Sequence, residues 1–339
     1  MTNSEKPDFL YKGHPVGNSV PFHPILMHFA ARFNHKTYAQ FASDYNILVE
    51  SNIRALEYFE LDMVGLISDP YRETSAFGAK IEYLEEGVPK CLDHIIKNID
   101  DVKALRNPDI YKSIRTLDRI KGVGLYQKIL KGTVPVCGWI EGPLAEACDL
   151  SGVSEMLVNL MTDPEFSNYL MDKCVVTAKE FAKAQIDEGC DIIGMGDAIC
   201  SQIGVDVYDT YIKDRHKEII EFIHSLNAKV KVHICGDITH LLPSLKDLNI
   251  DILDIDWKVD MEIAHTVLGE KVFCCGNINP VTIQDKNENE LLQTTKDLVQ
   301  KEQNRRFILS GGCEITVNTP YQNLKAMREA TKQSVNALN

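Results

Sequence analysis

The chain has 339 residues, of which 44% are hydrophobic and 25% are charged, and its formal net charge is -13. Such a composition supports a sizeable core and excludes a largely disordered chain. The negative charge argues against a nucleic-acid partner and against a protein that sits on an anionic membrane surface.

The N-terminal run MTNSEKPDFLYKGHP has no apolar core of the kind found in signal peptides. No apolar stretch of the chain approaches the ~20 residues of a membrane-spanning helix. The ten cysteines are scattered through a large chain, so we expect most of them to be free thiols in a reducing compartment. These observations predict a soluble cytoplasmic protein in which residues 1–19 form an N-terminal extension.

Short apolar runs recur along the chain, and each is followed by a turn and a helical pattern. Continuous runs of this kind are typical of strands that are buried on both faces of a parallel sheet. The eight predicted strands are Val20–Met27, Asp62–Ser68, Val134–Ile140, Asp191–Gly196, Val230–Cys235, Asp251–Asp256, Lys271–Gly276 and Arg306–Ser310.

Helical patterns separate these strands, and some begin at Asp-Pro or Thr-Pro pairs, which are frequent at helix starts. The predicted helices include Lys36–Phe59, Asp163–Glu188, Tyr208–Leu226, Asp285–Gln303 and Thr319–Leu338. Eight strands alternating with helices predict an α/β protein, a single (β/α)8 TIM barrel over residues 1–339. Residues 69–110 are an excursion after the second strand, in which KIEYLEEGVP is predicted to form a small hairpin or a lid.

The chain carries a split set of soft metal ligands. His233 and Cys235 lie two apart in KVHICGD, and Cys313 follows FILSGG. Because alternate residues of a strand point to the same side, the first two side chains can bind one ion. Two sulfurs and one nitrogen suit zinc, and three protein ligands leave the open position of a catalytic site. The alternative is a satisfied core histidine with buried free cysteines.

In TIM barrels the catalytic groups lie at the C-terminal ends of the strands. The predicted fifth strand ends at His233 and Cys235, Cys313 follows the eighth, and glycines at both places allow close approach of the backbone to a bound group. A zinc ion there either holds a substrate thiol as a thiolate or lowers the pKa of a water, and the pattern leaves both open. Polar residues also follow the other predicted strands: His28, Asp69, Glu141, Asp197, Asp256, Asn277 and Glu314.

Four runs of the sequence carry a family resemblance. HICGDITHLLPSL, DILDIDWKVD, the GNINP turn and LSGGCEI resemble the uroporphyrinogen decarboxylase superfamily, in particular its zinc-dependent methylcobamide:coenzyme M methyltransferase branch. The resemblance covers almost the whole chain, from about residue 20 to residue 330. It implies one barrel whose mouth holds zinc through His233, Cys235 and Cys313, with Asp256 or Glu314 as a fourth ligand that a substrate thiol displaces.

The resemblance also implies a reaction. A thiolate formed at the zinc takes the methyl group from the cobalt of a methylcobamide, and Co(I) leaves. No DxHxxG-type cobalamin motif occurs in this chain, so the corrinoid is expected on a partner protein. Asp256, Glu141 and Asp197 are assigned catalytic, orienting roles, and His28 and Asn277 are assigned to cofactor binding. Ordinary barrel-end hydrogen bonding is the alternative for each.

Two alternative activities stay open. Members of the superfamily also work in the opposite direction and move methyl from an aryl methyl ether, a methylamine or a methyl thiol to a Co(I) corrinoid. A true uroporphyrinogen decarboxylase is disfavoured because its RQAGRY-type arginine motif is replaced here by VPFHPILMHFAARF. Superfamily analogy favours a homodimer. We expect Trp139 and Trp257 to lie in the core rather than to support the corrin ring.

Overall fold

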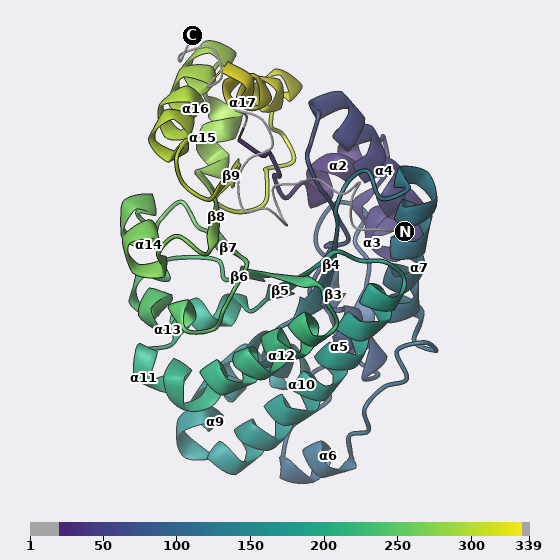
Figure 1. Cartoon of the computed structure of the whole chain (residues 1–339). Coiled ribbons are helices and arrows are strands. Elements are labelled where there is room, and N and C mark those ends of the chain that lie inside the picture. The colour runs from purple at the N-terminus through teal and green to yellow at the C-terminus, as the bar shows by residue number, and fades with distance from the viewer. Residues whose placement is uncertain (1–19, 334–339) are drawn as a thin grey trace.

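The computed structural model describes residues 20–333. Its central element is a curled sheet of seven parallel strands with helices packed around its outside (Figure 1). Neighbouring strands follow the chain order, which confirms the predicted α/β barrel. The strands are β1 (Val64–Gly65), β4 (Val136–Glu141), β5 (Ile192–Gly196), β6 (Lys229–His233), β7 (Ile252–Ile255), β8 (Phe273–Ile278) and β9 (Phe307–Gly311).

The predicted first strand, Val20–Met27, is wrong. Phe22 forms one isolated parallel bridge with Leu309 of β9, and a helix begins at the end of the segment. Prolines lie on both sides of Phe22, and because proline has no backbone N–H it cannot extend a ladder. The carbonyl of Phe22 also accepts a hydrogen bond at 3.0 Å from the N–H of Asp62, just before β1. The segment therefore joins the last strand to the first and closes the ring.

Helices follow most of the strands and form the outer layer (Figure 1). None of the helices between residues 20 and 333 is both long and apolar enough to cross a membrane. The helices are α2 (Met27–Phe33), α3 (Tyr38–Ser43), α4 (Tyr45–Phe59), α5 (Arg72–Ala76), α6 (Ile99–Ala104), α7 (Ile114–Leu130), α8 (Pro143–Ser151), α9 (Val153–Thr162), α10 (Pro164–Asp187), α11 (Val205–Val207), α12 (Lys213–Ser225), α13 (Leu242–Lys246), α14 (Met261–Leu268), α15 (Pro280–Asp285), α16 (Glu288–Glu302) and α17 (Tyr321–Gln333).

Local side-chain chemistry sets several helix boundaries. The predicted helix Lys36–Phe59 divides at Asp44, whose backbone is extended and whose carboxylate caps α4 by accepting from the N–H of Asn46 at 2.8 Å. The predicted helix Tyr208–Leu226 opens with a π-helical turn over Tyr208–Ile212 before α12. The predicted N-terminal extension, and the end of the last predicted helix beyond residue 333, lie outside the described residues.

The excursion after β1 contains the helices α5 and α6 and a hairpin. The hairpin pairs β2 (Ile81–Glu82) with β3 (Lys90–Cys91) in the antiparallel sense, so the run KIEYLEEGVP forms the first of the two predicted alternatives. Its tip lies near α2, because the Glu86 carboxylate contacts the His28 ring nitrogen Nε2 at 2.8 Å.

Alternate residues of the strands line the inside of the barrel. Seven of them form a buried apolar cluster: Met63, Cys137, Ile192, Ile252, Phe273, Cys275 and Ile308. Steps of two along the same strands, towards their C-terminal ends, lead to Asp254, Asp256, Glu141 and Asn277. The sheet register places His233 of β6 beside Asp254 of β7. The barrel interior is therefore apolar further from the mouth and polar near the C-terminal ends of the strands.

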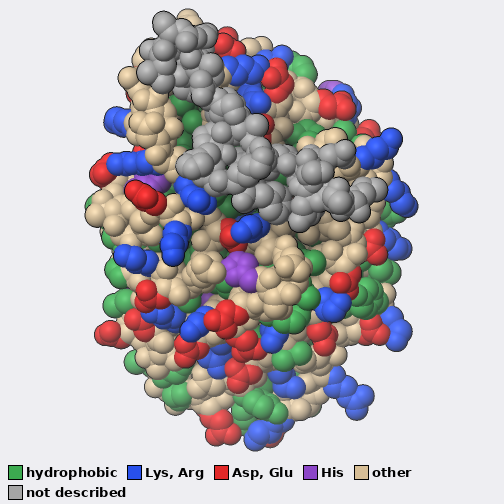
Figure 2. All heavy atoms as spheres, viewed as in Figure 1, with side chains coloured by type: hydrophobic (Ala, Val, Ile, Leu, Met, Phe, Trp, Pro, Cys, Tyr) green, Lys and Arg blue, Asp and Glu red, His purple; other side chains and the backbone are tan. Residues whose placement is uncertain are grey.

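The outer surface carries both signs of charge. On the face shown in Figure 2, acidic and basic side chains are interspersed, and the described residues of that face form no continuous basic surface.

Candidate metal centre

Three soft ligands meet at the C-terminal mouth of the barrel. His233 is the last residue of β6, Cys235 lies two residues further on, and Cys313 follows β9. Their ligand atoms all lie within 4.8 Å of one another. His233 Nε2 is 2.9 Å from the Cys235 sulfur, and the two sulfurs are 3.6 Å apart. The structure thus brings together residues that are 78 positions apart in the chain.

The spacing of these atoms fits one tetrahedral zinc ion. Zinc–sulfur bonds of about 2.3 Å at tetrahedral angles place two sulfurs roughly 3.8 Å apart, close to the distance between Cys235 and Cys313. The thiols also interact with each other. The hydrogen bond from Cys235 lowers the pKa of Cys313 to about 4, and the same bond raises the pKa of Cys235. One sulfur of the pair is therefore readily present as the thiolate that metals bind.

A buried carboxylate orients the histidine. His233 Nδ1 lies 2.8 Å from Asp254 Oδ2, and Lys231 Nζ lies 3.1 Å from the other oxygen of that carboxylate. An imidazole that donates from Nδ1 presents the lone pair of Nε2, which is how metal-binding histidines are commonly held. Neither Asp254 nor Lys231 was among the predicted site residues. The signal was the alternation of Lys231 with His233 along one strand.

Asp256 and two glycines shape the loops that carry the cysteines. The Asp256 carboxylate accepts from the N–H of Gly236 at 2.9 Å and from the N–H of Lys258 at 3.0 Å. Gly236 has a φ of +98°, which favours glycine. At Gly312 a side chain would overlap the backbone nitrogen of Trp257. Glycine is needed there because the loops after β7 and β9 are in contact. We had predicted instead that glycine lets the backbone approach a bound group.

Trp139 lies beside the candidate ligand His233. Its ring packs against the His233 ring with centroids 5.9 Å apart. A side chain on Gly194 of the neighbouring strand would overlap the same indole. The indole N–H donates to Glu141 Oε1 at 3.2 Å. Glu141 is therefore connected to His233 through Trp139.

Asn277 and the segment that leads to His28 lie on either side of β9, the strand before Cys313. The Asn277 amide donates to the carbonyl of Val259 at 2.9 Å. The backbone N–H of His28 donates to Glu314 Oε1 at 3.1 Å, next to Cys313. Burial raises the pKa of Glu314 to about 7. The two residues that we assigned to cofactor binding thus adjoin the ligand loops, and each makes hydrogen bonds within the protein.

Asp197 is fully buried beneath α8, on the other side of β5 from the ligands. Its carboxylate accepts from the N–H of Ala145 at 2.8 Å and lies 2.9 Å from His216 Nε2. Asp197, Cys200 and His216 form a second group with metal-ligand chemistry. His216 Nδ1 also contacts the Tyr208 hydroxyl at 2.9 Å, so both of its ring nitrogens are engaged within the protein. The structure therefore does not bring Asp197 to the first centre.

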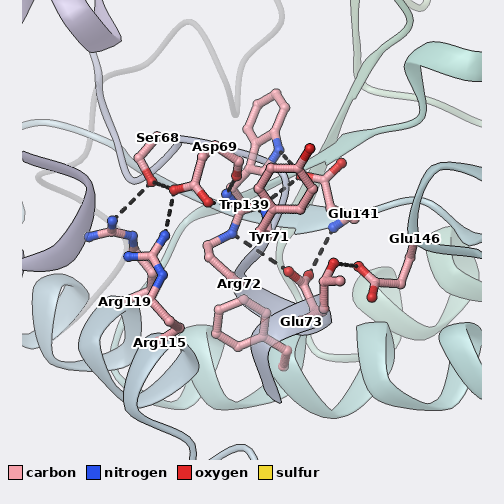
Figure 3. A network of polar contacts seen from close by, with 12 residues as sticks. Ser68, Asp69, Tyr71, Arg72, Glu73, Arg115, Arg119, Trp139, Glu141 and Glu146 are labelled. Atoms are coloured by element: carbon pink, nitrogen blue, oxygen red, sulfur yellow. Dashed lines mark hydrogen bonds and ion pairs between the residues drawn. The ribbon is translucent and has the colours of Figure 1, made fainter. Parts of the chain in front are cut away.

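A buried polar network lies around the ends of β1 and β4 (Figure 3). Arg72 of α5 pairs with Glu141 at 2.5 Å, and Arg115 of α7 pairs with Asp69. Burial acts to raise the pKa of Asp69, but Arg115 and Arg72 outweigh it and hold the value at about 2. Arg119 donates to the Ser68 hydroxyl at 2.9 Å. The two carboxylates follow predicted strands and were expected at the mouth, whereas the arginines lie on helices and were not predicted.

The position of Trp257 contradicts the expectation that it lies in the core. It follows Asp256 at the mouth, its backbone and Cβ lie against Gly312, and the residue is 46% exposed. Trp139, by contrast, is buried as expected. The sequence around Trp257 is polar on both sides, and that pattern was the available signal.

Residues 11–334 match the family model described as uroporphyrinogen decarboxylase (URO-D). The chain belongs to this family. A methylcobamide:CoM methyltransferase MtbA from Methanosarcina mazei is 28% identical over 247 residues, which cover 72% of this chain and 71% of the relative. A uroporphyrinogen decarboxylase from Thermodesulfovibrio yellowstonii is 24% identical over 287 residues, covering 83% and 82%. The predicted superfamily is confirmed, and the first relative bears the name of the predicted branch.

Solved structures share the fold. A methyltransferase from Methanosarcina mazei superimposes with a TM-score of 0.87 at 19% identity, over 96% of both chains. A B12-independent methionine synthase from Shewanella sp. W3-18-1 gives a TM-score of 0.58 at 15% identity, over 86% of this chain and 88% of the other. At these identities the likeness establishes the barrel architecture.

Proposed function

We propose that the chain is a corrinoid-dependent methyltransferase that holds zinc through His233, Cys235 and Cys313 and moves a methyl group between a methylcobamide and a thiol. The observation that carries the proposal is the meeting of these three ligands at the mouth of the barrel. Two relatives named methylcobamide:CoM methyltransferase support the reaction. Coenzyme M is therefore the first thiol to test.

The chemistry follows from the ligand set. Zinc held by these residues would supply the positive charge that keeps a substrate thiol as a thiolate near neutral pH. The thiolate sulfur attacks the methyl carbon, and a carbon–sulfur bond forms. The electron pair of the cobalt–carbon bond stays on cobalt, which leaves as Co(I), and the thiol proton passes to solvent. The protein contributes orientation and exclusion of water.

The remaining mouth residues act by positioning. Asp256 holds the loop after Cys235 through its hydrogen bond to Gly236. Glu141 holds the Trp139 indole beside His233. Asn277 and His28 border the cysteine loops, where a cofactor on a partner protein would arrive.

The corrinoid comes on a partner protein and meets the chain at the barrel mouth. A cobamide ring has to lie over the mouth for its methyl group to reach a sulfur at the ligands. Trp257 stands there, half exposed and in contact with the loop that carries Cys313. Its indole offers a flat apolar surface to a planar ring. The reduced thiols of the centre suit a cytoplasmic location.

A spectroscopic assay tests the proposal. Zinc-loaded protein is mixed with methylcobalamin and either coenzyme M or homocysteine under anaerobic conditions, and the visible spectrum of the cobalt is followed. We expect the methyl-cobalt absorption to disappear only when a thiol is present, and C235S and C313S to lose both zinc and turnover. Full zinc content and activity in both variants would refute the site. Turnover of uroporphyrinogen without any methyl transfer would instead favour the decarboxylase.

The same assay run backwards tests the donor-side alternative. Co(I) cobalamin is offered with a methyl thiol, an aryl methyl ether or a methylamine, and formation of methylcobalamin is measured. Methylation of Co(I) by one of these donors, with no demethylation of methylcobalamin by any thiol, would assign the chain to that activity.

A further inference from the structure

A buried lysine lies beneath the candidate metal centre. Lys231 is on β6, two residues before His233, and its side chain is 1% exposed. Its ammonium lies 3.1 Å from Asp254 Oδ1, while Asp254 Oδ2 faces His233 Nδ1 at 2.8 Å. The two oxygens of one carboxylate are thus divided between a lysine and a metal ligand. A lysine is rarely found so deeply buried without a specific partner.

We propose that Lys231 is a positioning residue for the metal centre, which fixes the Asp254 carboxylate so that this in turn fixes His233 with Nε2 towards the metal. The inference rests on the proposed zinc site and deepens it. It assigns a role to a residue that never touches zinc or substrate. Carboxylates that hold metal-binding histidines are common, and here the carboxylate has its own buried anchor.

Asp254 is the negatively charged partner of Lys231, because the other polar groups around the ammonium are uncharged near neutral pH. Three other polar groups of the described interior face the ammonium: His23, Cys137 and Cys275. Burial lowers the pKa of His23 to about 3 and raises the pKa of Cys137 to about 11, and it also raises the pKa of Cys275. These groups are uncharged near neutral pH. The Asp254 carboxylate is therefore held by one strong, charge-assisted bond on its far side.

The same strand offers a matched comparison. Lys229 lies 2.8 Å from Asp251 Oδ1, and Asp251 Oδ2 lies 2.7 Å from His224 Nε2. This second lysine–carboxylate–histidine group has the same connections, but it sits at the N-terminal end of β6 and its histidine belongs to α12. Removing its lysine changes one charge and one ion pair without touching the metal centre.

The experiment measures zinc affinity rather than activity. The full-length protein is stripped of metal, checked for its fold by circular dichroism, and titrated with zinc against a chromogenic chelator. We expect K231M and D254N each to weaken zinc binding by about 10- to 100-fold. K229M should bind zinc as the parent does. Parental affinity in K231M would overturn the proposal.

The double variant gives the sharper result. In D254N the lysine attracts the amide oxygen, so the amide N–H2 turns towards His233 and favours the wrong imidazole tautomer. In K231M/D254N the amide is free to turn its oxygen to His233, and zinc affinity should equal or exceed that of D254N. A further loss in the double variant would show that Lys231 does not act through Asp254. If K231M alone fails to fold, the comparison of D254N with the double variant still tests whether Lys231 acts through Asp254. The double variant leaves neither buried charge unpaired.

Failure of this proposal is distinguishable from failure of the proposed zinc site. If C235S and C313S bind zinc as tightly as the parent, the site itself is wrong. If they lose zinc while K231M keeps it, only the positioning role of Lys231 is wrong.

Discussion

The Asp256 carboxylate accepts a hydrogen bond from the backbone N–H of Gly236 at 2.9 Å, one residue after the candidate ligand Cys235. Its other oxygen accepts from the N–H of Lys258 at 3.0 Å. One side chain therefore links the loop after β6 to the loop after β7. The carboxylate therefore fixes the loop after β6, which carries Cys235 and is called the cysteine loop below; this link between the two loops is called the brace.

Replacement of this brace should loosen the cysteine loop. We expect D256A to lower the free energy of unfolding by about 1–3 kcal/mol, because two backbone N–H groups lose a charged acceptor. Zinc affinity should fall roughly tenfold. The control is D260A, which removes a carboxylate that accepts from the N–H groups of Glu262 and Ile263 at the start of α14. Urea unfolding and chelator competition measure both effects, and equal zinc affinities for D256A and D260A would contradict the assignment.

The indole of Trp139 should not tolerate a side chain on Gly194. An added methyl group would overlap the ring, so G194A should displace Trp139 and cost about 1–3 kcal/mol of stability. Because the ring packs on His233, zinc affinity should fall as well. Gly204 has no heavy atom within 4 Å of such a group, so G204A serves as the control and should change stability by less than about 0.5 kcal/mol. Thermal unfolding of both variants with and without zinc tests the contrast.

The ion pair between Asp69 and Arg115 should appear in the pH dependence of stability. The pKa of Asp69 is held at about 2, below its ordinary value of 3.8, so its ionised form stabilises the fold. That contribution is present above pH 3.8 and is lost as the pH falls towards 2. We expect D69N to be about 3–5 kcal/mol less stable than the parent at neutral pH, because it leaves a buried arginine unpaired. The difference should narrow below pH 4.

Urea unfolding at several pH values measures this difference. The exposed pair of Asp109 and Lys112 offers the control, and D109N should behave as the parent does. A difference between D69N and the parent that stays constant from pH 7 to pH 3 would show that the ionisation of Asp69 is not its source.

Trp257 should contribute to binding of the corrinoid protein and little to folding. We expect W257A to raise the KM for the corrinoid partner roughly tenfold, as expected for loss of an aromatic contact of about 1–1.5 kcal/mol. The unfolding free energy should change little, because 46% of the side chain is exposed. I114A removes another exposed apolar side chain, on α7, and should leave the KM unchanged. Equal KM values for W257A and the parent would remove Trp257 from the docking surface.

The barrel and the ligand set follow from short-range sequence patterns. Strands buried on both faces appear as apolar runs, and the spacing of His233 and Cys235 places both side chains at the same strand end. The glycines before Cys313 were predicted to allow close approach to a bound group, whereas the neighbour of Gly312 is the backbone at Trp257. The strands and the pair of His233 and Cys235 depend on residues that are close in sequence, whereas Cys313, 78 positions from Cys235, joins them because a barrel gathers its strand ends at one mouth.

The features that were missed depend on partners far apart in the chain. The segment around Phe22 is apolar enough for a strand, but its prolines and its bridge to Leu309 make it an irregular closing piece. Asp197 and Glu141 both lie at strand ends, yet the Asp197 side chain faces the helix layer. Successive residues of a strand point to opposite faces of the sheet, so a shift of one residue along the strand is enough to produce this difference. Asp254 and Lys231 were not predicted, because the role of a charged residue inside a barrel can be assigned only when its partner is known.

Zinc-edge X-ray absorption, recorded with and without the thiol substrate, tests the central claim most directly. The resting protein should show two sulfur ligands and at least one nitrogen ligand, supplied by Cys235, Cys313 and His233. Addition of coenzyme M or another accepted thiol should raise the count to three sulfurs. A zinc shell without sulfur, or one that does not change with any thiol that supports methyl transfer, would contradict the account.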